Sequence, residues 1–130
     1  FITVSPRNSD KNYLTSDKMI HCYIENDQLY YIGDNKPSVD SPIQLKVYNE
    51  CQEIHYMIHG HAFIKNADFT KEYYLCGDLR EADEIIRHIK NNPTFGCLNL
   101  KNHGFIIYSD TISNMEKLIS KLDFYYNNLD

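Results

Sequence analysis

The sequence predicts one layered domain of the α/β or α+β class, spanning residues 1–130, in which helices pack against a mixed sheet. Short β-branched and aromatic runs alternate with three stretches in which apolar residues recur every three or four positions. The 130 residues are enough to bury one core, and 42% of them are hydrophobic and 24% are charged. This composition is ordinary for a globular domain.

The expected elements follow from these patterns and from the turn residues between them. They are strands at 1–5, 18–24 and 29–32, a helix at 41–51, a strand at 54–63, a helix at 79–90, strands at 95–100 and 105–109, and a final helix that begins after residue 110 or 111. Asp40 or Ser41 caps the first helix, with Pro42 in its first turn, and Asp78 caps the second. The order strands, helix, strand, helix, two strands, helix is the basis for the predicted class.

Each expected helix has an apolar face that should contact the sheet or another subunit. The residues of these faces are Ile43, Leu45, Val47, Tyr48 and Cys51 in the first helix, Leu79, Ala82, Ile85, Ile86 and Ile89 in the second, and Ile112, Met115, Leu118, Ile119, Leu122 and Leu129 in the third.

Charge and cysteine usage limit the partners and the compartment. The net charge of −5 argues against a nucleic-acid partner or an anionic membrane surface. No apolar run approaches the roughly 20 residues of a membrane span, and nothing resembles a signal peptide. The four cysteines are dispersed without a C-x-x-C pair, which favours reduced thiols in a cytoplasmic protein.

Candidate metal ligands lie in the expected strand at 54–63 and in a later turn. His59 and His61 are separated only by Gly60, so on a strand both side chains point to the same face and could bind one metal ion. His103 lies in a turn and is followed by Gly104, a position from which it could complete the site. Two hydrogen-bonded strand histidines and a turn histidine bonded to backbone fit the same pattern.

Asp40 is the candidate carboxylate of this site. It lies 19 residues before His59 at an expected helix start, where a plain N-cap role is equally compatible with its position. Three histidines and one exchangeable carboxylate would form a mononuclear zinc site with an open position. Such a site polarises a substrate oxygen, and a carboxylate that leaves the metal can act as a general base.

Three motifs in this order resemble the class II aldolase/adducin family, typified by L-fuculose-1-phosphate aldolase and L-ribulose-5-phosphate 4-epimerase. They are Pro-Ser-Val-Asp at 37–40, Ile-His-Gly-His at 58–61 and Asn-His-Gly at 102–104. The opening strand, the hairpin and Cys76-Gly77 also resemble segments of that family, so the likeness covers nearly the whole chain. It implies a largely antiparallel sheet flanked by helices and a homo-oligomer, commonly a tetramer.

The resemblance also implies the roles of individual residues. His59, His61 and His103 would bind one zinc ion, and Asp40 would take the place of the family's acid/base glutamate. Ser38 and Ser5 match positions that hold a substrate phosphate. The implied reaction is retro-aldol cleavage or epimerisation of a small phosphorylated sugar, with zinc stabilising an enediolate.

The chain also departs from the family pattern. The family's glycine-rich phosphate loop would lie upstream of Phe1, which suggests a shortened relative or a piece that has lost its N-terminal part. The segment between His61 and His103 is shorter than in the aldolases, and it omits the loop that carries a catalytic tyrosine, a role for which Tyr73 or Tyr74 could substitute. Two alternatives therefore stay open. One is a non-catalytic binding or assembly module like the adducin head, and the other is a zinc hydrolase.

Overall fold

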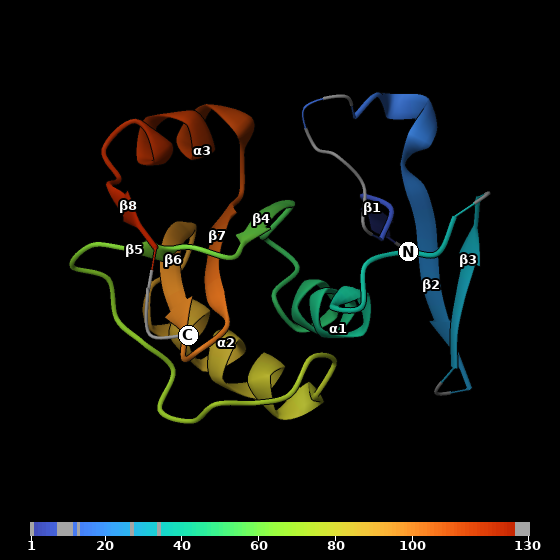
Figure 1. Ribbon diagram of the computed structural model, residues 1–130, viewed down its shortest axis with the longest axis horizontal. Coiled ribbons are helices and arrows are strands. Elements are labelled where there is room, and N and C mark those ends of the chain that lie inside the picture. The colour runs from blue at the N-terminus through green and yellow to red at the C-terminus, as the bar shows by residue number, and fades with distance from the viewer. Residues whose placement is uncertain (1, 8–11, 13, 27, 34, 127–130) are drawn as a thin grey trace.

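The computed structural model describes residues 2–7, 12, 14–26, 28–33 and 35–126, so Phe1 and Leu129 lie outside the described residues. The described elements are β1 (Ile2–Val4), a 3-10 helix η2 (Ser16–Lys18), β2 (Ile20–Glu25), β3 (Gln28–Ile32), α1 (Ser41–Glu50), β4 (Tyr56–Gly60), β5 (Phe63–Ile64), α2 (Leu79–Asn91), β6 (Phe95–Leu100), β7 (Gly104–Ser109), α3 (Ile112–Ile119) and β8 (Phe124–Tyr125). Figure 1 shows their arrangement.

The mixed α/β class is confirmed, but the prediction of one mixed sheet is wrong. The described strands form three separate sheets, β1-β2-β3, β4-β7-β6 and β5-β8, and all their paired strands are antiparallel. The physical reason is that α1 lies between the N-terminal sheet and the central one. An isolated bridge between Phe69 and Asn99 is parallel.

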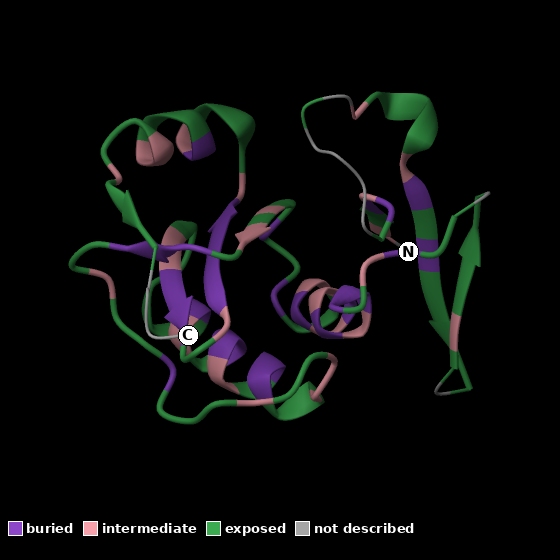
Figure 2. Cartoon of the chain, in the orientation of Figure 1, coloured by how far each residue is buried: buried purple, intermediate pink, exposed green. Residues whose placement is uncertain are grey.

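The central sheet has a core on each face because β7 is its middle strand and is buried along its whole length (Figure 2). Ile106 and Tyr108 point to the face that α1 and α2 cover, where they pack with Val47, Ile85 and Ile89 among others. Phe105 and Ile107 point to the other face and pack with Ala62, Ile64 and Met115. This alternation is the period of two that a strand imposes.

Helix α1 is buried on two sides, which explains its apolar residues outside a single stripe. Ile43 and Val47 contact the central core, whereas Leu45 packs with Val4, Ile20 and Cys22 of the N-terminal sheet. Figure 1 shows this sheet on the far side of α1 from β7. The N-terminal sheet is thus joined to the rest of the fold through one helix.

Several element boundaries differ from the sequence-based expectation. The expected strand at 54–63 is interrupted after Gly60 and continues as the short β5, and β8 was not predicted. Helix α3 ends at Ile119, so Leu122 packs on the core from the following turn. Leu79 and Ile112 were expected on apolar faces but are 47% and 54% exposed, because each is the first residue of its helix.

The four cysteines are free thiols, as the sequence predicted. Within the described part of the chain, none of the helices has the length and apolar character that crossing a membrane requires.

Candidate metal centre

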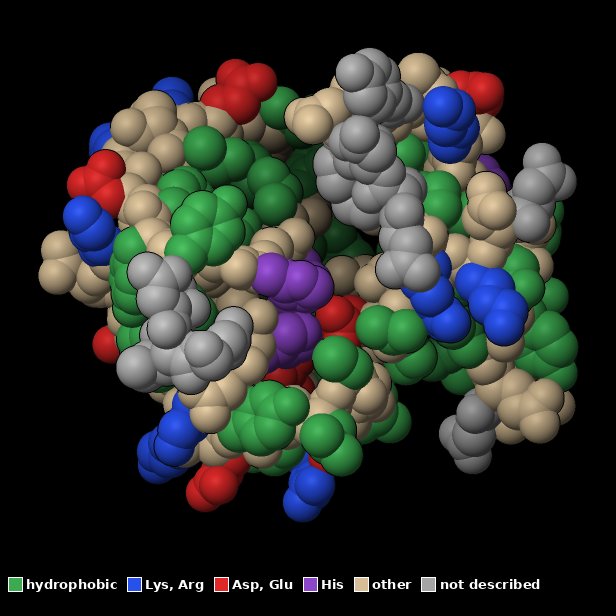
Figure 3. Space-filling view, viewed as in Figure 1, with side chains coloured by type: hydrophobic (Ala, Val, Ile, Leu, Met, Phe, Trp, Pro, Cys, Tyr) green, Lys and Arg blue, Asp and Glu red, His purple; other side chains and the backbone are tan. Residues whose placement is uncertain are grey.

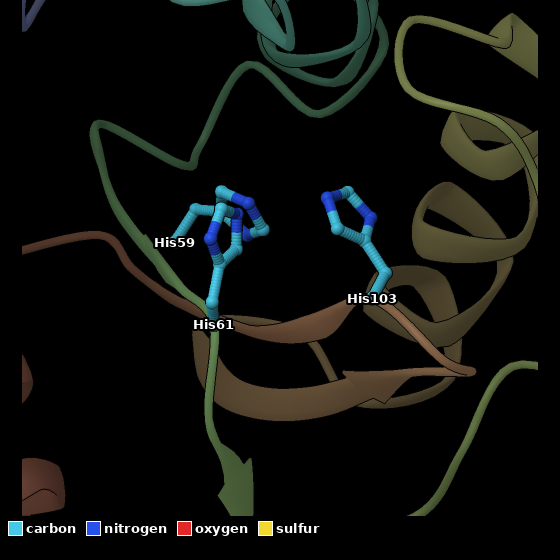
Figure 4. A group of neighbouring side chains, drawn as sticks. All are labelled: His59, His61 and His103. Atoms are coloured by element: carbon cyan, nitrogen blue, oxygen red, sulfur yellow. The ribbon is translucent and has the colours of Figure 1, made fainter. Parts of the chain in front are cut away.

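The three candidate histidines meet at one end of the central sheet. His59 lies on β4, His61 follows in the bend after that strand, and His103 lies in the turn between β6 and β7. Figure 4 shows their rings pointing into a shared space. The centroid of the His59 ring lies 5.1 Å from the centroid of the His61 ring and 4.7 Å from that of the His103 ring. The structure therefore brings together side chains that are more than 40 residues apart in the sequence.

Two glycines allow the backbone segments that carry these histidines to approach closely. A Cβ atom on Gly104 would lie 2.0 Å from the carbonyl oxygen of Gly60, which no side chain could tolerate. The sequence predicted that the backbone at Gly104 would need the freedom of a glycine. Its φ of 159° and its close approach to Gly60 agree with that prediction. His103 follows Asn102, whose φ of 55° is also in the left-handed region that Asn tolerates. The tight turn thus sets His103 beside the histidine pair.

The ring of His59 is oriented by a backbone hydrogen bond. Its Nδ1 lies 2.9 Å from the carbonyl oxygen of Phe105. A carbonyl can only accept, so Nδ1 of His59 donates the proton of this hydrogen bond. The Nε2 atom of the same ring lies 3.2 Å from Oδ2 of Asp40.

His103 is oriented in the same manner by a buried carboxylate. Its Nδ1 lies 3.1 Å from Oε2 of Glu81, a residue of α2 that is only 2% exposed. Because a carboxylate accepts, Nδ1 donates to Glu81 and Nε2 faces Oδ2 of Asp40 at 3.5 Å. A histidine that donates one ring nitrogen to a carboxylate is the usual arrangement of a metal-ligating histidine.

Asp40 precedes α1 but its carboxylate does not cap that helix. The side chain turns instead toward His59 and His103 and is 9% exposed. Burial is the largest influence on the pKa of Asp40 and raises it, but the contacts with His103 and His59 together outweigh burial and hold the pKa below its usual range. Asp40 thus occupies the predicted N-cap position of α1, but its side chain does not cap the helix.

Three buried polar atoms meet at the centre without a hydrogen bond to any described residue. Within the described part of the chain, Oδ1 of Asp40 and Nε2 of both His59 and His103 are buried without a hydrogen-bond partner of good geometry. Unpaired buried polar groups are costly, and lone pairs that face one another require a cation between them. That cation is either an extra proton or a metal ion.

The two carboxylates at the centre favour a proton on His103. The carboxylates of Asp40 and Glu81 raise the pKa of His103 to about 10 against the opposing effect of burial. His61 behaves differently, because burial and then the neighbouring His59 and His103 lower its pKa. The centre therefore combines one histidine that binds a proton tightly with one that readily loses it.

The spacing of the three histidines also fits a metal ion. One ring nitrogen from each of His59, His61 and His103 lies within 4.8 Å of the others. Two nitrogens bound to one zinc ion at about 2.1 Å each are at most about 4.2 Å apart. Small side-chain rotations would therefore bring all three to binding distance. These donor types, three imidazoles and a carboxylate, are those of zinc sites with an open position.

A cavity of about 390 Å³ opens beside the centre (Figure 3 shows the histidines at a hollow on this face). Its lining residues are His61, Phe63, Tyr73, Tyr74, Cys76, Asn102, His103 and Tyr126. Tyr73 and Tyr74, the two residues named from the sequence as substitutes for a catalytic tyrosine, are thus next to the site. A larger cavity, of about 680 Å³, lies between the N-terminal sheet and β4, but it has a mainly apolar lining and contains none of the clustered histidines.

Neither of the two predicted phosphate-binding serines lines this cavity. A bridge between Pro6 and Pro37 places Ser5 and Ser38 in neighbouring segments. The hydroxyl of Ser38 accepts a hydrogen bond from the backbone N–H of Asp40 at 3.3 Å. Arg7 joins the same bridge, because its Nε donates to the carbonyl of Pro37 at 3.2 Å.

Sequence reasoning missed Glu81, although a signal was present. Glu81 precedes Ile85 and Ile89 by four and eight residues, so it continues the buried stripe of α2 as a carboxylate. A charged residue on such a stripe indicates a buried partner. Cys76 was quoted only for its resemblance to a family segment, and nothing in its sequence neighbourhood indicated that it would line the cavity.

Neither a protein-family model nor a curated protein matches this chain.

Proposed function

We propose that this protein binds one divalent metal ion, with zinc as the best fit, through His59, His61 and His103. The observation that carries this proposal is the convergence of three buried polar atoms, Nε2 of His59, Nε2 of His103 and Oδ1 of Asp40, none of which has a hydrogen-bond partner among the described residues. Nδ1 of each of the two rings is already engaged by an acceptor. A site built only for structural hydrogen bonds would leave few such atoms unpaired.

A divalent ion held there would polarise a substrate carbonyl or hydroxyl as a Lewis acid. We assign proton transfer to Asp40 on its position. Its Oδ2 reaches the centre, and its Oδ1 has no hydrogen-bond partner in the described part of the chain. A carboxylate placed there is within reach of a proton on a bound substrate.

We assign the reaction to the aldolase type, a zinc-dependent lyase or epimerase that acts on a small phosphorylated sugar. The ordered motifs at 37–40, 58–61 and 102–104 support this assignment. Arg7, Ser5 and Ser38 lie around the bridge between Pro6 and Pro37, outside the cavity lining, and they offer the guanidinium and hydroxyl groups that commonly bind phosphate. Tyr73 and Tyr74 line the cavity, where a phenol could protonate a leaving oxygen.

Metal analysis of the purified protein tests the first part of this proposal. We expect one zinc ion per chain, bound at micromolar concentration or tighter, and loss of binding in the His59→Ala variant. His55→Ala is the matched control, because His55 is exposed and lies on the same segment four residues earlier. Absence of any bound divalent metal would overturn both the metal and the lyase assignments.

A panel of ketose phosphates and their unphosphorylated counterparts tests the second part. We expect zinc-dependent release of dihydroxyacetone phosphate or formation of an epimer from a phosphorylated substrate only. Equal turnover of the unphosphorylated sugars would remove the phosphate role of Arg7, Ser5 and Ser38. Zinc-loaded protein that is inactive on the whole panel would contradict the lyase assignment, and hydrolytic activity would favour the zinc hydrolase.

A non-catalytic assembly module is the second candidate. Five large apolar side chains of the β2–β3 hairpin are 37% to 66% exposed, namely Tyr23, Ile24, Tyr30, Tyr31 and Ile32. The strand register places Tyr23, Tyr30 and Ile32 on one face of the hairpin, and Ile24 and Tyr31 on the opposite face. The exposed apolar group of Tyr23, Tyr30 and Ile32 favours contact between subunits. Sedimentation analysis tests it, because a homo-oligomer that dissociates in an Ile32→Asp variant while zinc stays bound would assign assembly to this face.

A further inference from the structure

Cys76 lies in a tight turn at the edge of the centre. The backbone N–H of Asp78 donates to the carbonyl of Leu75 at 3.0 Å, which closes the turn. Gly77 has a φ of 83° at the third position of the turn, a conformation that strongly favours glycine. The thiol of Cys76 is exposed and lines the cavity beside His61 and His103. The position of Cys76 is therefore set by a defined turn.

This turn passes close to the segment that carries Asp40 and leads directly into α2. A Cβ atom built on Gly77 would lie 3.6 Å from the carbonyl oxygen of Val39, the residue before Asp40. The carboxylate of Asp78 accepts from the N–H of Arg80 at 3.0 Å and caps α2. The first turn of that helix carries Glu81, whose carboxylate accepts from His103. The segment 76–81 is therefore tied to the centre through Glu81.

A second set of ligand atoms includes this thiol. Sγ of Cys76, a carboxylate oxygen of Asp40 and a ring nitrogen of His103 all lie within 4.8 Å of one another. Asp40 and His103 each have a buried polar atom that is available to bind an ion. Their side chains are 9% and 7% exposed, and Oδ1 of Asp40 and Nε2 of His103 have no hydrogen-bond partner among the described residues.

We propose that Cys76 is a further ligand of the metal centre and binds the ion through its thiolate on the side that faces the cavity. The inference rests on the metal site proposed above. When the sulfur–metal bond forms, the thiol proton passes to solvent, and no oxidant or reductant is required. The ligand set at rest is then three imidazoles and one thiolate, with Asp40 beside it as the exchangeable carboxylate.

Two consequences follow from this ligand. A thiolate makes the site selective for zinc, cobalt and cadmium over magnesium and manganese, because the latter prefer oxygen ligands. Three imidazoles and one thiolate also complete the four-coordinate shell of a closed zinc site. A substrate that enters the cavity must then displace Cys76, which is free to leave because it is exposed. The thiol would thus protect the ion until substrate binds.

Cobalt substitution tests the proposal without reference to enzymatic activity. The wild-type protein titrated with Co²⁺ is expected to show visible d–d bands and a near-ultraviolet sulfur-to-cobalt charge-transfer band. Cys76→Ser is expected to lose the charge-transfer band and keep the d–d bands. Cys97→Ser is the matched control and keeps both, because Cys97 packs in the core formed around Phe105 and Ile107.

The outcomes separate this proposal from the one it rests on. Visible d–d bands without a charge-transfer band in the wild type would overturn the role of Cys76 and leave the histidine site standing. A charge-transfer band that survives in Cys76→Ser would assign it to another thiol and also overturn the proposal. No cobalt bands at all would overturn both proposals. As a second measurement, zinc is expected to protect Cys76 from alkylation by iodoacetamide, and unprotected alkylation of zinc-loaded protein would contradict the proposal.

Discussion

The two halves of the candidate metal centre are built differently. The buried half consists of Asp40, His59, Glu81 and His103, whose side chains are 3% to 13% exposed. Each of its two rings has its orientation set by an acceptor, the carbonyl of Phe105 for His59 and the carboxylate of Glu81 for His103. The open half consists of His61, Tyr73, Tyr74 and Cys76, which line the cavity, and within the described residues no hydrogen bond orients the ring of His61.

The difference indicates a division of labour between holding an ion and exchanging its ligands. Fixed rings lose little freedom when an ion binds, so the buried half should provide most of the affinity. Exposed ligands can leave and return, so the open half should control which molecule reaches the ion. Substitutions in the buried half and in the open half should therefore have different effects.

The largest effect is expected from Asp40→Asn, which removes the base of the buried half and keeps its shape. We expect turnover of the identified ketose phosphate to fall by about 10²–10⁴-fold, the usual contribution of a general base. Zinc binding should be largely preserved, since the three imidazoles remain. Asp83→Asn is the control, because Asp83 pairs with Lys46 on the surface at 2.7 Å. Turnover retained in Asp40→Asn would refute its role as base.

His59→Ala should have the next largest effect, on affinity for zinc. Structural zinc sites with four ligands bind with about 10–16 kcal/mol, so one ligand is worth roughly 3 kcal/mol, or on the order of a hundredfold. Isothermal titration against a competing chelator measures this change. His61→Ala should weaken binding less than His59→Ala, because the ring of His61 is not held in place beforehand. The reverse ranking would contradict the division between the two halves.

Glu81→Gln should weaken zinc binding by about 10–100-fold, the usual cost of losing a carboxylate partner of a ligating histidine. The amide keeps the shape of the side chain, so the fold should persist. Nitrogen chemical shifts of His103 provide the second readout, since the Nδ1–H form should lose population in the variant. Glu116→Gln on the exposed side of α3 is the control. Unchanged affinity together with unchanged shifts would show that Glu81 does not position His103.

The last prediction concerns the effect of pH on the metal-free protein. The pKa of His103 is raised from 6.5 to about 10, so the folded chain binds that proton more tightly than the unfolded chain does. The resulting stability is fully present below about pH 6.5 and is lost as the pH rises toward about 10. Thermal unfolding of the metal-free protein should show this fall, and a Glu81→Gln variant should flatten it.

Zinc affinity should change with pH in the opposite direction over the same interval. Zinc must displace the proton of His103, so apparent affinity should rise by up to about tenfold per pH unit. Affinity that is independent of pH would mean that His103 carries no proton in the metal-free centre.

Some of this centre could be predicted from local sequence and some could not. The pairing of His59 and His61 was predictable from the single glycine between them, although β4 ends at Gly60 and His61 lies in the following bend. His103 in a turn before Gly104 was predictable as well. Asp40 was ambiguous, since a carboxylate before a helix is usually its cap, and only the positions of His59 and His103 determine where it points. Local sequence thus predicted the histidines, whereas the orientation of Asp40 depends on contacts made by folding.

The remaining features depend on contacts between distant segments. Glu81 reaches His103 because α2 packs against the central sheet, and Cys76 reaches the cavity because a turn precedes that helix. The spacing of apolar residues predicted α2 and its buried face. This spacing does not indicate which loop packs against that face. For the same reason the separation of the N-terminal sheet from the central one was missed, because Leu45 contacts one sheet while Val47 contacts the other.

A crystal structure of the zinc-loaded protein, with anomalous scattering recorded at the zinc edge, tests the central claim most directly. We predict a single strong anomalous peak at about 2.0–2.1 Å from one nitrogen of each of His59, His61 and His103. A zinc-soaked crystal with no peak among these three rings, or with the peak bound elsewhere, would contradict the account.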